Sequence, residues 1–384
     1  MMRGALTGLV SLAATAALQA AATPAGAGAQ GALSQLGFGY PAGGVSARSL
    51  ATGGALADAD PLSAVNPAAI VLNARARGYI QFEPEFRTVQ VGAVSTPTTT
   101  FRFPLFMVTG QQSKATFALS YASFMDRTWS NSYPDTQAIG GERIPSTVLT
   151  SSEGGIADIR GAVAWSFNER IHVGIAAHLF PGQDRVVAGR IFPDSLQAGG
   201  FQNTNTYTFE GAGASLGAVW ITPSHVTLAA DLRAGGSLSM RLGDSVRVGS
   251  GRVPLRYGAS VLYDGVPGAV FAVRYSRERW TDLRGLGSSS LGIADATDFS
   301  AGAEAAGPRL GPSTVTFRLG YRARGLPFTY LGDRVGETMA GGGIGVPLGG
   351  TRAFLDLGLA RVARRAADVR ERAWIMSLGV GIKP

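Results

Sequence analysis

The sequence predicts an all-β fold, a transmembrane antiparallel β-barrel of about 14 strands with an N-terminal hatch in its lumen. From about residue 78 onward, short segments are apolar at every second residue. This period places apolar side chains on one face of a strand and polar ones on the other. The turns between the segments alternate between short and long, which is typical of barrels that cross a membrane. Mean hydropathy is +0.14, and no later run approaches the roughly 20 apolar residues of a spanning helix.

The first 29 residues are expected to be removed during export. Arg3 precedes a long apolar stretch, and the small residues Ala27 and Ala29 follow it. A basic start, an apolar middle and a small-residue cleavage site are typical of a secretory signal peptide, here 1–29. The Pro and Gly residues between Pro24 and Gly28 favour this interpretation over an N-terminal membrane anchor.

Residues 30–76 differ in composition from the chain that follows. They are rich in Gly and Ala and lack strand alternation. The segment is too polar to cross lipid and too apolar to be a free tail, so it must be buried against another part of the protein. We therefore expect it to form a hatch, or plug, inside the mouth of the barrel, and residues 77–384 to form the barrel itself.

Each predicted strand sends one set of side chains to lipid and the other to the lumen. In the first strand, Ile80 and Phe86 are expected outside while Glu83 and Glu85 face inward. The second strand, near 98–110, is predicted to point outward with Phe101, Phe103, Leu105 and Met107. Aromatic residues of the outward face lie near strand ends, as in a membrane-interface girdle: Trp165, Trp220, Tyr263 and Trp374. A soluble β-sandwich also alternates, but its loops need not alternate in length.

The connections predict the topology. The longer polar links fall near 131–150, 190–205, 243–252, 282–297, 325–336 and 363–371, with short turns between them. Long loops belong on the extracellular side and short turns on the periplasmic side. An even number of strands then places both chain ends in the periplasm, where the hatch enters.

The distribution of charge argues against nucleic-acid binding and allows two roles for the arginines that face the lumen. Lys and Arg outnumber Asp and Glu by 34 to 26, giving a formal net charge of +8, yet the arginines are spread along the chain and do not form a nucleic-acid patch. Inward arginines alternate with acids such as Asp158, Asp231 and Asp356, so they can form an ion-pair network across strands. Alternatively, one or two of them bind a ligand carboxylate; the candidate contacts are Arg160, Arg233, Arg274, Arg318 and Arg322.

Nothing in the sequence indicates an enzyme, a metal site or a cofactor. The chain has no Cys and only three His. His172 and His178 share an inward face but are about 20 Å apart along a strand, too far to chelate one metal. His225 is at a predicted turn. No GxSxG motif is present, and the Gly-rich stretches lack the Lys-Ser/Thr pair of a phosphate loop.

A motif near the N-terminus is more specific than the alternation. Residues 47–72, ARSLATGGALADADPLSAVNPAAIVL, contain a Gly/Ala run, an acidic stretch and the tripeptide NPA. This pattern resembles the N-terminal signature of the FadL/OmpP1/TodX superfamily of outer-membrane transport proteins. The chain departs from the family pattern after NPA, where it has Ala69 and Ile70. The matching hatch residues are Gly53, Gly54, Asp58, Asp60, Asn66, Pro67 and Ala68.

The resemblance implies a transport function and one alternative function. Members of the family pass hydrophobic small molecules, such as long-chain fatty acids, across the outer membrane of Gram-negative-type bacteria by passive transport. A monomer in contact with outer-membrane lipid and a hydrophobic small-molecule ligand is therefore expected. PorV-like members instead bind exported proteins in a secretion system, and this remains the alternative. The chain ends in Lys383-Pro384, although many outer-membrane barrels end in an aromatic residue.

Overall fold

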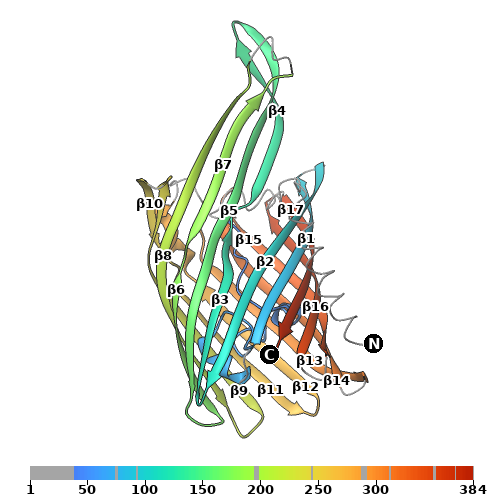
Figure 1. The fold of residues 1–384 in the computed structure, drawn as a ribbon. Helices are drawn as coiled ribbons and strands as arrows, with labels where there is room; N and C mark the ends of the chain where they lie inside the picture. Colours follow the sequence, from blue (N-terminus) through green and yellow to red (C-terminus); the bar gives the residue numbers. More distant parts are fainter. Residues whose placement is uncertain are drawn as a thin grey trace, which may run out of the picture.

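The strands form one closed antiparallel barrel, because β1 pairs with β2 on one side and with β17 on the other (Figure 1). The computed structural model describes residues 39–383 except 74–76, 92–93, 194–198, 244, 287–291, 311–312, 349–351 and 368. The predicted fold class, a transmembrane β-barrel, is confirmed. The predicted signal peptide 1–29 and the first part of the predicted hatch, 30–38, lie outside the described residues.

The barrel wall has the predicted number of strands, although three of them are interrupted. The strands are β1 (Arg77–Val91), β2 (Val94–Gln112), β3 (Ala115–Asp126), β4 (Trp129–Ile139), β5 (Glu142–Ser166), β6 (Ile171–Leu179), β7 (Gly182–Ile191), β8 (Phe201–Ile221), β9 (Val226–Leu242), β10 (Val246–Arg252), β11 (Arg256–Val266), β12 (Ala269–Glu278), β13 (Ala296–Leu310), β14 (Ser313–Tyr330), β15 (Asp333–Leu348), β16 (Ala353–Ala366) and β17 (Val369–Ile382). β3 and β4 pair with the same edge of β5, and β6 and β7 share neighbours likewise. β10 and β11 both pair with β9. The 17 strands of the sheet therefore form 14 lines around the wall, 3 of the strands being continuations.

The predicted alternation separates an apolar exterior from a polar interior. In β6, Ile171, Ile175 and Leu179 are exposed on the outside, whereas His172 and His178 are buried inside. The same pattern in most of the other wall strands leaves a belt of large apolar side chains on the outer surface. Such a belt is too extensive for a surface in water and fits a lipid environment. Among the described helices, none is both long and apolar enough to cross a membrane.

The prediction for the second strand was half wrong. Phe101 and Phe103 point outward, but Leu105 and Met107 are 1% and 0% exposed and face the lumen. The register of β2 against β1 shifts at this point, because Gln81 pairs with Leu105 whereas Glu83 pairs with Arg102. Such a bulge adds a residue to one strand and reverses which face each later side chain takes.

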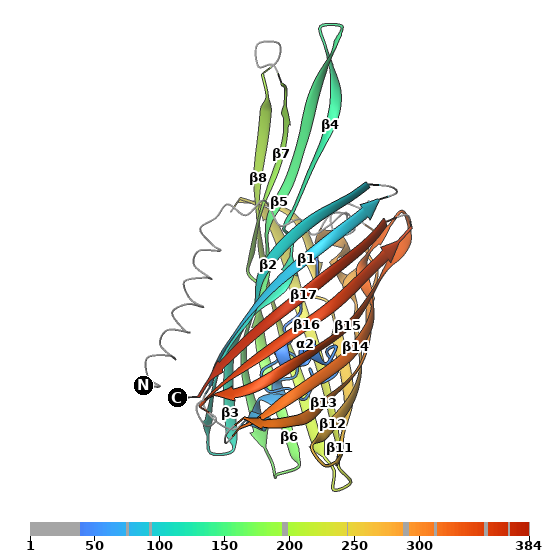
Figure 2. The same ribbon diagram turned by 90° about the vertical axis from the view of Figure 1, so that its right-hand side faces the viewer.

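Two hairpins project beyond the rest of the wall, where polar links were predicted near 131–150 and 190–205. β4 with the first half of β5, and β7 with the first half of β8, pair into one extension above the barrel (Figures 1 and 2). The links predicted near 325–336 and 363–371 are mostly strand as well. Inter-strand hydrogen bonds need no apolar side chains, so strands can continue beyond the lipid where apolar alternation is no longer required.

The described N-terminal segment 39–73 lies inside the barrel (Figure 2). It contains the helix α2 (Ala47–Ala51) and the 3-10 helix η2 (Pro67–Asn73), and a second 3-10 helix, η3 (Trp280–Leu286), packs near β10. The Ser46 side chain accepts a hydrogen bond from the Ser49 backbone and so caps α2. Most residues from Ser46 to Val71 are buried, so the barrel wall provides the cover that the composition of this segment requires.

Candidate ligand site in the barrel lumen

Two glycines of the N-terminal motif end helix α2. Gly53 and Gly54 have φ values of +69° and +91°, a region that side chains with a Cβ rarely adopt. The Gly53 amide donates to the Leu50 carbonyl at 2.9 Å and the Gly54 amide to the Ser49 carbonyl at 2.7 Å. These two bonds form a Schellman motif, which satisfies the last carbonyls of a helix. The glycine pair therefore turns the chain toward the acidic stretch.

Asp60 holds the N-terminal segment together. Its carboxylate accepts hydrogen bonds from the Ser49 hydroxyl at 2.7 Å and the Ser63 hydroxyl at 2.8 Å, and also from the Ser46 hydroxyl. Asp60 is fully buried. A buried carboxylate requires such donors because an unpaired charge in a low dielectric is costly. Asp60 is therefore engaged within the segment and does not face the cavity described below.

Asp58 and Asn66 attach the segment to the wall. Asp58 accepts a hydrogen bond from Arg274 Nε at 2.8 Å. The Asn66 side chain accepts a hydrogen bond from the Ala68 amide at 2.9 Å and so caps the start of η2 beside Pro67. The same side chain donates a hydrogen bond to the Ala218 carbonyl of β8 at 3.2 Å. Asn66 and Pro67 do not line the cavity described below, so the NPA tripeptide folds and docks the segment.

A cavity of about 110 Å³ lies between the N-terminal segment and the upper part of the wall. On one side it is lined by residues of the N-terminal segment, Pro41–Val45, Gly54, Ala64 and Val65. On the other side it is lined by five cationic side chains from four strands, Arg233, Arg256, Arg274, Arg322 and Arg324, accompanied by the acids Asp158, Glu278 and Asp298. The lumen thus gathers five guanidinium groups around one small space.

Arg233 differs from the other cavity arginines because neither of its contacts with acids is a hydrogen bond. Its nearest acid atoms are 3.5 Å away on Glu278 and 3.9 Å away on Asp158. Its Nε and one terminal nitrogen are buried without a hydrogen-bond partner. Its guanidinium instead stacks over two rings, 5.2 Å from the centroid of Phe124 and 5.9 Å from that of Phe180. Two free donors at the wall of a cavity fit the geometry of a carboxylate.

Apolar side chains cluster inside the barrel next to Arg233. Phe124 contacts Phe180 at 4.9 Å and stacks on Trp280 at 5.5 Å between ring centroids. Phe124 and Trp280 also line the cavity. The cluster continues toward the projecting end of the barrel with Phe209, Leu238, Val253, Leu283 and Leu286. An ionic lumen therefore contains one apolar wall, and it borders the arginines.

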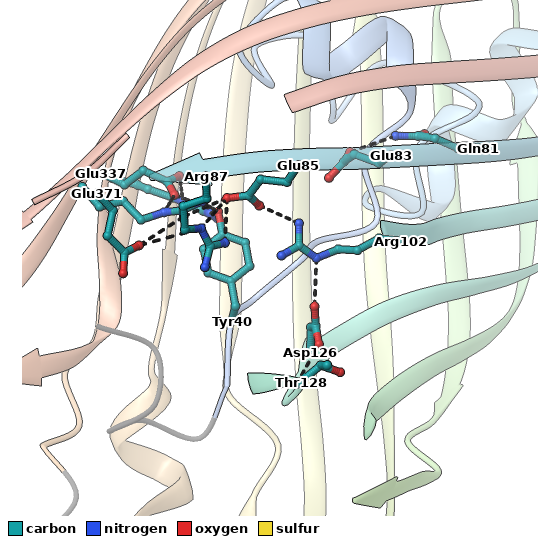
Figure 3. Close-up of polar contacts among 12 residues, drawn as sticks. Tyr40, Gln81, Glu83, Glu85, Arg87, Arg102, Asp126, Thr128, Glu337 and Glu371 are labelled. Carbon is teal, nitrogen blue, oxygen red and sulfur yellow. Dashed lines mark hydrogen bonds and ion pairs between the residues drawn. The ribbon is translucent and has the colours of Figure 1, made fainter. Parts of the chain in front are cut away.

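A second polar network surrounds Tyr40 (Figure 3). The Tyr40 hydroxyl donates to Glu337 at 2.7 Å and accepts from Arg364 at 2.9 Å and from Arg324 at 2.5 Å. Glu85 joins the network through Arg364 at 2.9 Å. Burial raises the pKa of the Tyr40 hydroxyl, so Tyr40 stays a neutral donor. This network tethers the start of the described chain beside the cavity.

The five arginines predicted as ligand contacts occupy three different environments. Arg233, Arg274 and Arg322 line the cavity. Arg318 does not line it and is paired with Glu304 at 2.8 Å and Asp356 at 2.5 Å. Arg160 is 1% exposed, its three guanidinium nitrogens have no hydrogen-bond partner in the described structure, and it does not line the cavity either.

Several site residues were not predicted as such. Arg256 and Arg324 line the cavity but were not among the predicted ligand contacts. Tyr40 was missed because its partners are about 300 residues away in sequence, for example 297 for Glu337. The alternation of strand faces was the available signal for Arg364 and Glu337, which point inward from β16 and β15.

Comparison with solved structures finds proteins that share the fold of this barrel. A FadL homologue of Pseudomonas aeruginosa superposes with a TM-score of 0.63 at 10% sequence identity, covering 90% of this chain and 99% of that one. The Ralstonia pickettii toluene transporter TbuX gives 0.61 at 16% identity, with coverage of 88% and 98%. The monoaromatic hydrocarbon channel CymD gives 0.57 at 14% identity, with coverage of 89% and 98%. No family model and no curated protein sequence matches the chain. The chain therefore has the fold of the FadL and TodX channels, as the N-terminal motif implied.

Proposed function

We propose that this barrel lies in the outer membrane and passes hydrophobic small molecules that carry an acidic group, such as long-chain fatty acids, by passive diffusion. The observation that carries the proposal is the cavity wall formed by Phe124, Trp280 and Arg233. An apolar body would contact the rings, and a carboxylate would take the two unpartnered donors of Arg233. The likeness of the fold to a protein described as a hydrocarbon channel and to one described as a toluene transporter supports the hydrophobic character of this cargo.

The N-terminal segment acts in this proposal as a hatch, comprising residues 30–76. The cavity of about 110 Å³ is smaller than the roughly 300–1,000 Å³ of typical small-molecule sites. A fatty acid therefore enters only when part of the hatch moves. Pro41–Val45 is the part that borders the cavity, and Tyr40 and Ala64 hold it in place through hydrogen bonds.

Uptake by whole cells tests the proposal. Cells with the wild-type gene, without it, and with Arg233→Gln would receive a labelled long-chain fatty acid or its methyl ester. A hydrogen bond to a charged group contributes about 1.5–3 kcal/mol, so the variant should lower fatty-acid uptake about tenfold or more. Uptake of the methyl ester, which has no carboxylate, should depend on the gene but little on Arg233.

The matched control is Arg185→Gln, which removes an exposed arginine of β7 in the projecting extension, away from the cavity. It should leave both uptakes unchanged. Equal uptake of both compounds with and without the gene would contradict transport. Equal loss of acid and ester in the Arg233 variant would contradict the assigned role of Arg233 but not transport itself.

A further inference from the structure

The turn of the hairpin formed by β16 and β17 lies near the end of the barrel that carries the projecting hairpins (Figure 2). Four arginines are exposed on the outer face of this hairpin. On the outward face of β17, the residues from the C-terminal end of the strand toward its start include Ile382, Leu378, Met376 and Trp374, and then the charged Arg372 and Arg370. Above Trp374, the exposed outward side chains change abruptly from apolar to basic: Arg361, Arg365, Arg370 and Arg372. We call these four residues the arginine quartet.

The register brings the quartet together. Arg365 and Arg370 are direct cross-strand partners, and like charges in that position repel each other. Arg372 follows Arg370 on the same face, about 7 Å along the strand. Arg361 lies opposite Trp374, with its guanidinium 5.6 Å from the ring centroid. An anion bound between these side chains would relieve the repulsion.

The described part of the protein does not supply that anion. None of the four arginines forms an ion pair with a described residue. Among the described residues, the acids nearest in register are Glu337 on β15 and Glu371 on β17. They are 2% and 1% exposed and point into the lumen, where they pair with Arg364. The outward neighbours across the strands are uncharged, such as Thr88 on β1 and Thr338 on β15.

An apolar groove of about 670 Å³ lies directly below the quartet on the same strands. Leu359 and Met376, which line it, are two residues below Arg361 and Trp374. Gly342 on β15 leaves the groove open on one side, and on the other the pairing of β1 with β17 is interrupted at Glu83 and Pro84. The remaining lining is Phe82, Gly343, Ile344, Leu357, Gly358, Ser377 and Leu378. The volume is within the range of sites that hold small ligands.

We propose that the quartet and the groove together bind one phosphorylated lipid of the outer leaflet, with its phosphates on the arginines and an acyl chain in the groove. Guanidinium groups bind phosphates through paired hydrogen bonds. A free phosphate would leave the apolar groove empty, whereas a lipid fills both parts at the depth where Trp374 marks the membrane interface. The proposal depends on the outer-membrane location proposed above and not on transport of any cargo.

Native mass spectrometry of the detergent-purified protein with defined lipids tests the inference. The probes are bisphosphorylated lipid A, the same lipid A with its phosphates removed, and inorganic phosphate. The wild type should retain bisphosphorylated lipid A. Its affinity for the dephosphorylated lipid should be lower by about tenfold or more, and its affinity for inorganic phosphate should be no higher than that for the dephosphorylated lipid. Equal retention of both lipids, or binding of inorganic phosphate alone, would overturn the proposal, and neither result needs a variant.

Variants then locate the site. Arg365→Gln with Arg370→Gln should lower binding of bisphosphorylated lipid A about tenfold. Arg143→Gln with Arg185→Gln, which removes the same charge from two exposed arginines of the projecting extension, should leave it unchanged. A double quartet variant that binds as the wild type does would refute the location. Fatty-acid uptake by the quartet variant should stay normal, so that failure of this proposal and failure of the transport proposal remain distinguishable.

Discussion

Many charged side chains in this lumen are buried and form ion pairs with one another. Glu337 is 2% exposed and contacts Arg324 at 2.6 Å, Arg364 at 2.7 Å and Arg322 at 3.2 Å. Removing one partner of such a set leaves the others buried without compensation, which costs more than the lost contact itself. Tyr40 is the member of this set that belongs to the N-terminal segment. One hydroxyl thus links that segment to three wall strands, β14, β15 and β16.

Replacing Tyr40 by Phe should therefore loosen the N-terminal segment without disturbing the wall. The variant keeps the ring on which Arg364 and Arg324 stack but loses hydrogen bonds to three charged groups. We expect a loss of about 2 kcal/mol in the free energy of unfolding, measured by thermal unfolding in detergent. Tyr321→Phe, which changes an outward tyrosine, is the control. A melting temperature of Tyr40→Phe equal to that of the control would show that the hydroxyl contributes nothing.

At the scale of elements, glycines of the wall determine where the N-terminal segment docks. A Cβ at Gly320 would lie 2.0 Å from the Thr52 carbonyl carbon, and one at Gly302 would lie 2.4 Å from the Thr52 carbonyl oxygen. A Cβ at Gly217 would lie 1.9 Å from the Asn66 side-chain oxygen. Glycine in a strand often marks such a close backbone approach. The segment thus lies directly against the backbone of the strands around it.

Gly320→Ala should consequently displace the segment from β14. Overpacking of this kind costs about 1–3 kcal/mol, and the added methyl meets backbone that cannot rotate away. We expect a higher ionic conductance in planar bilayers, since the displaced segment leaves the lumen partly open. Gly161→Ala in β5 is the matched control, because its Cβ would meet no atom within 4 Å. Unchanged conductance in a folded Gly320→Ala protein would contradict close docking of the segment.

At the scale of the whole molecule, the wall and its contents make separable contributions. Fourteen strands enclose a lumen wide enough to need a filling, and the segment 39–73 fills much of it through buried contacts with strands on several sides. The wall itself closes through hydrogen bonds between neighbouring strands and uses no part of that segment. The barrel should therefore survive removal of its contents.

Deletion of residues 39–73 tests this separation. The shortened protein should still form a barrel, seen as retention of compact migration in unheated SDS gels, because every wall pairing remains. Its conductance should increase severalfold over that of the wild type, since the lumen widens with the number of strands and is then unfilled. A folded deletion protein with wild-type conductance would contradict the role of the segment as a hatch. Failure to form a barrel would show that the segment is needed for assembly of the wall.

The apolar alternation of the sequence predicts some features of this structure and misses others. Alternation correctly assigned the faces of most wall strands, because a strand between lipid and water must expose apolar side chains on one face only. It failed at Leu105 and Met107, where a bulge reverses the faces, and in the projecting hairpins, where no lipid imposes a pattern. For the site, it placed Arg233, Arg274 and Arg322 inside but could not select them from the other inward arginines.

The amino-acid sequence by itself determined that this chain is a barrel with an oily exterior and an ionic interior, because side-chain direction in a strand depends only on position along it. Tertiary structure alone decided which charges meet. Arg364 and Tyr40 are 324 residues apart in sequence and 2.9 Å apart in space, and only closure of the barrel brings them together. The same closure leaves Arg233 beside the aromatic wall with two donors that have no hydrogen-bond partner, since its ion pairs with Glu278 and Asp158 are 3.5 and 3.9 Å long.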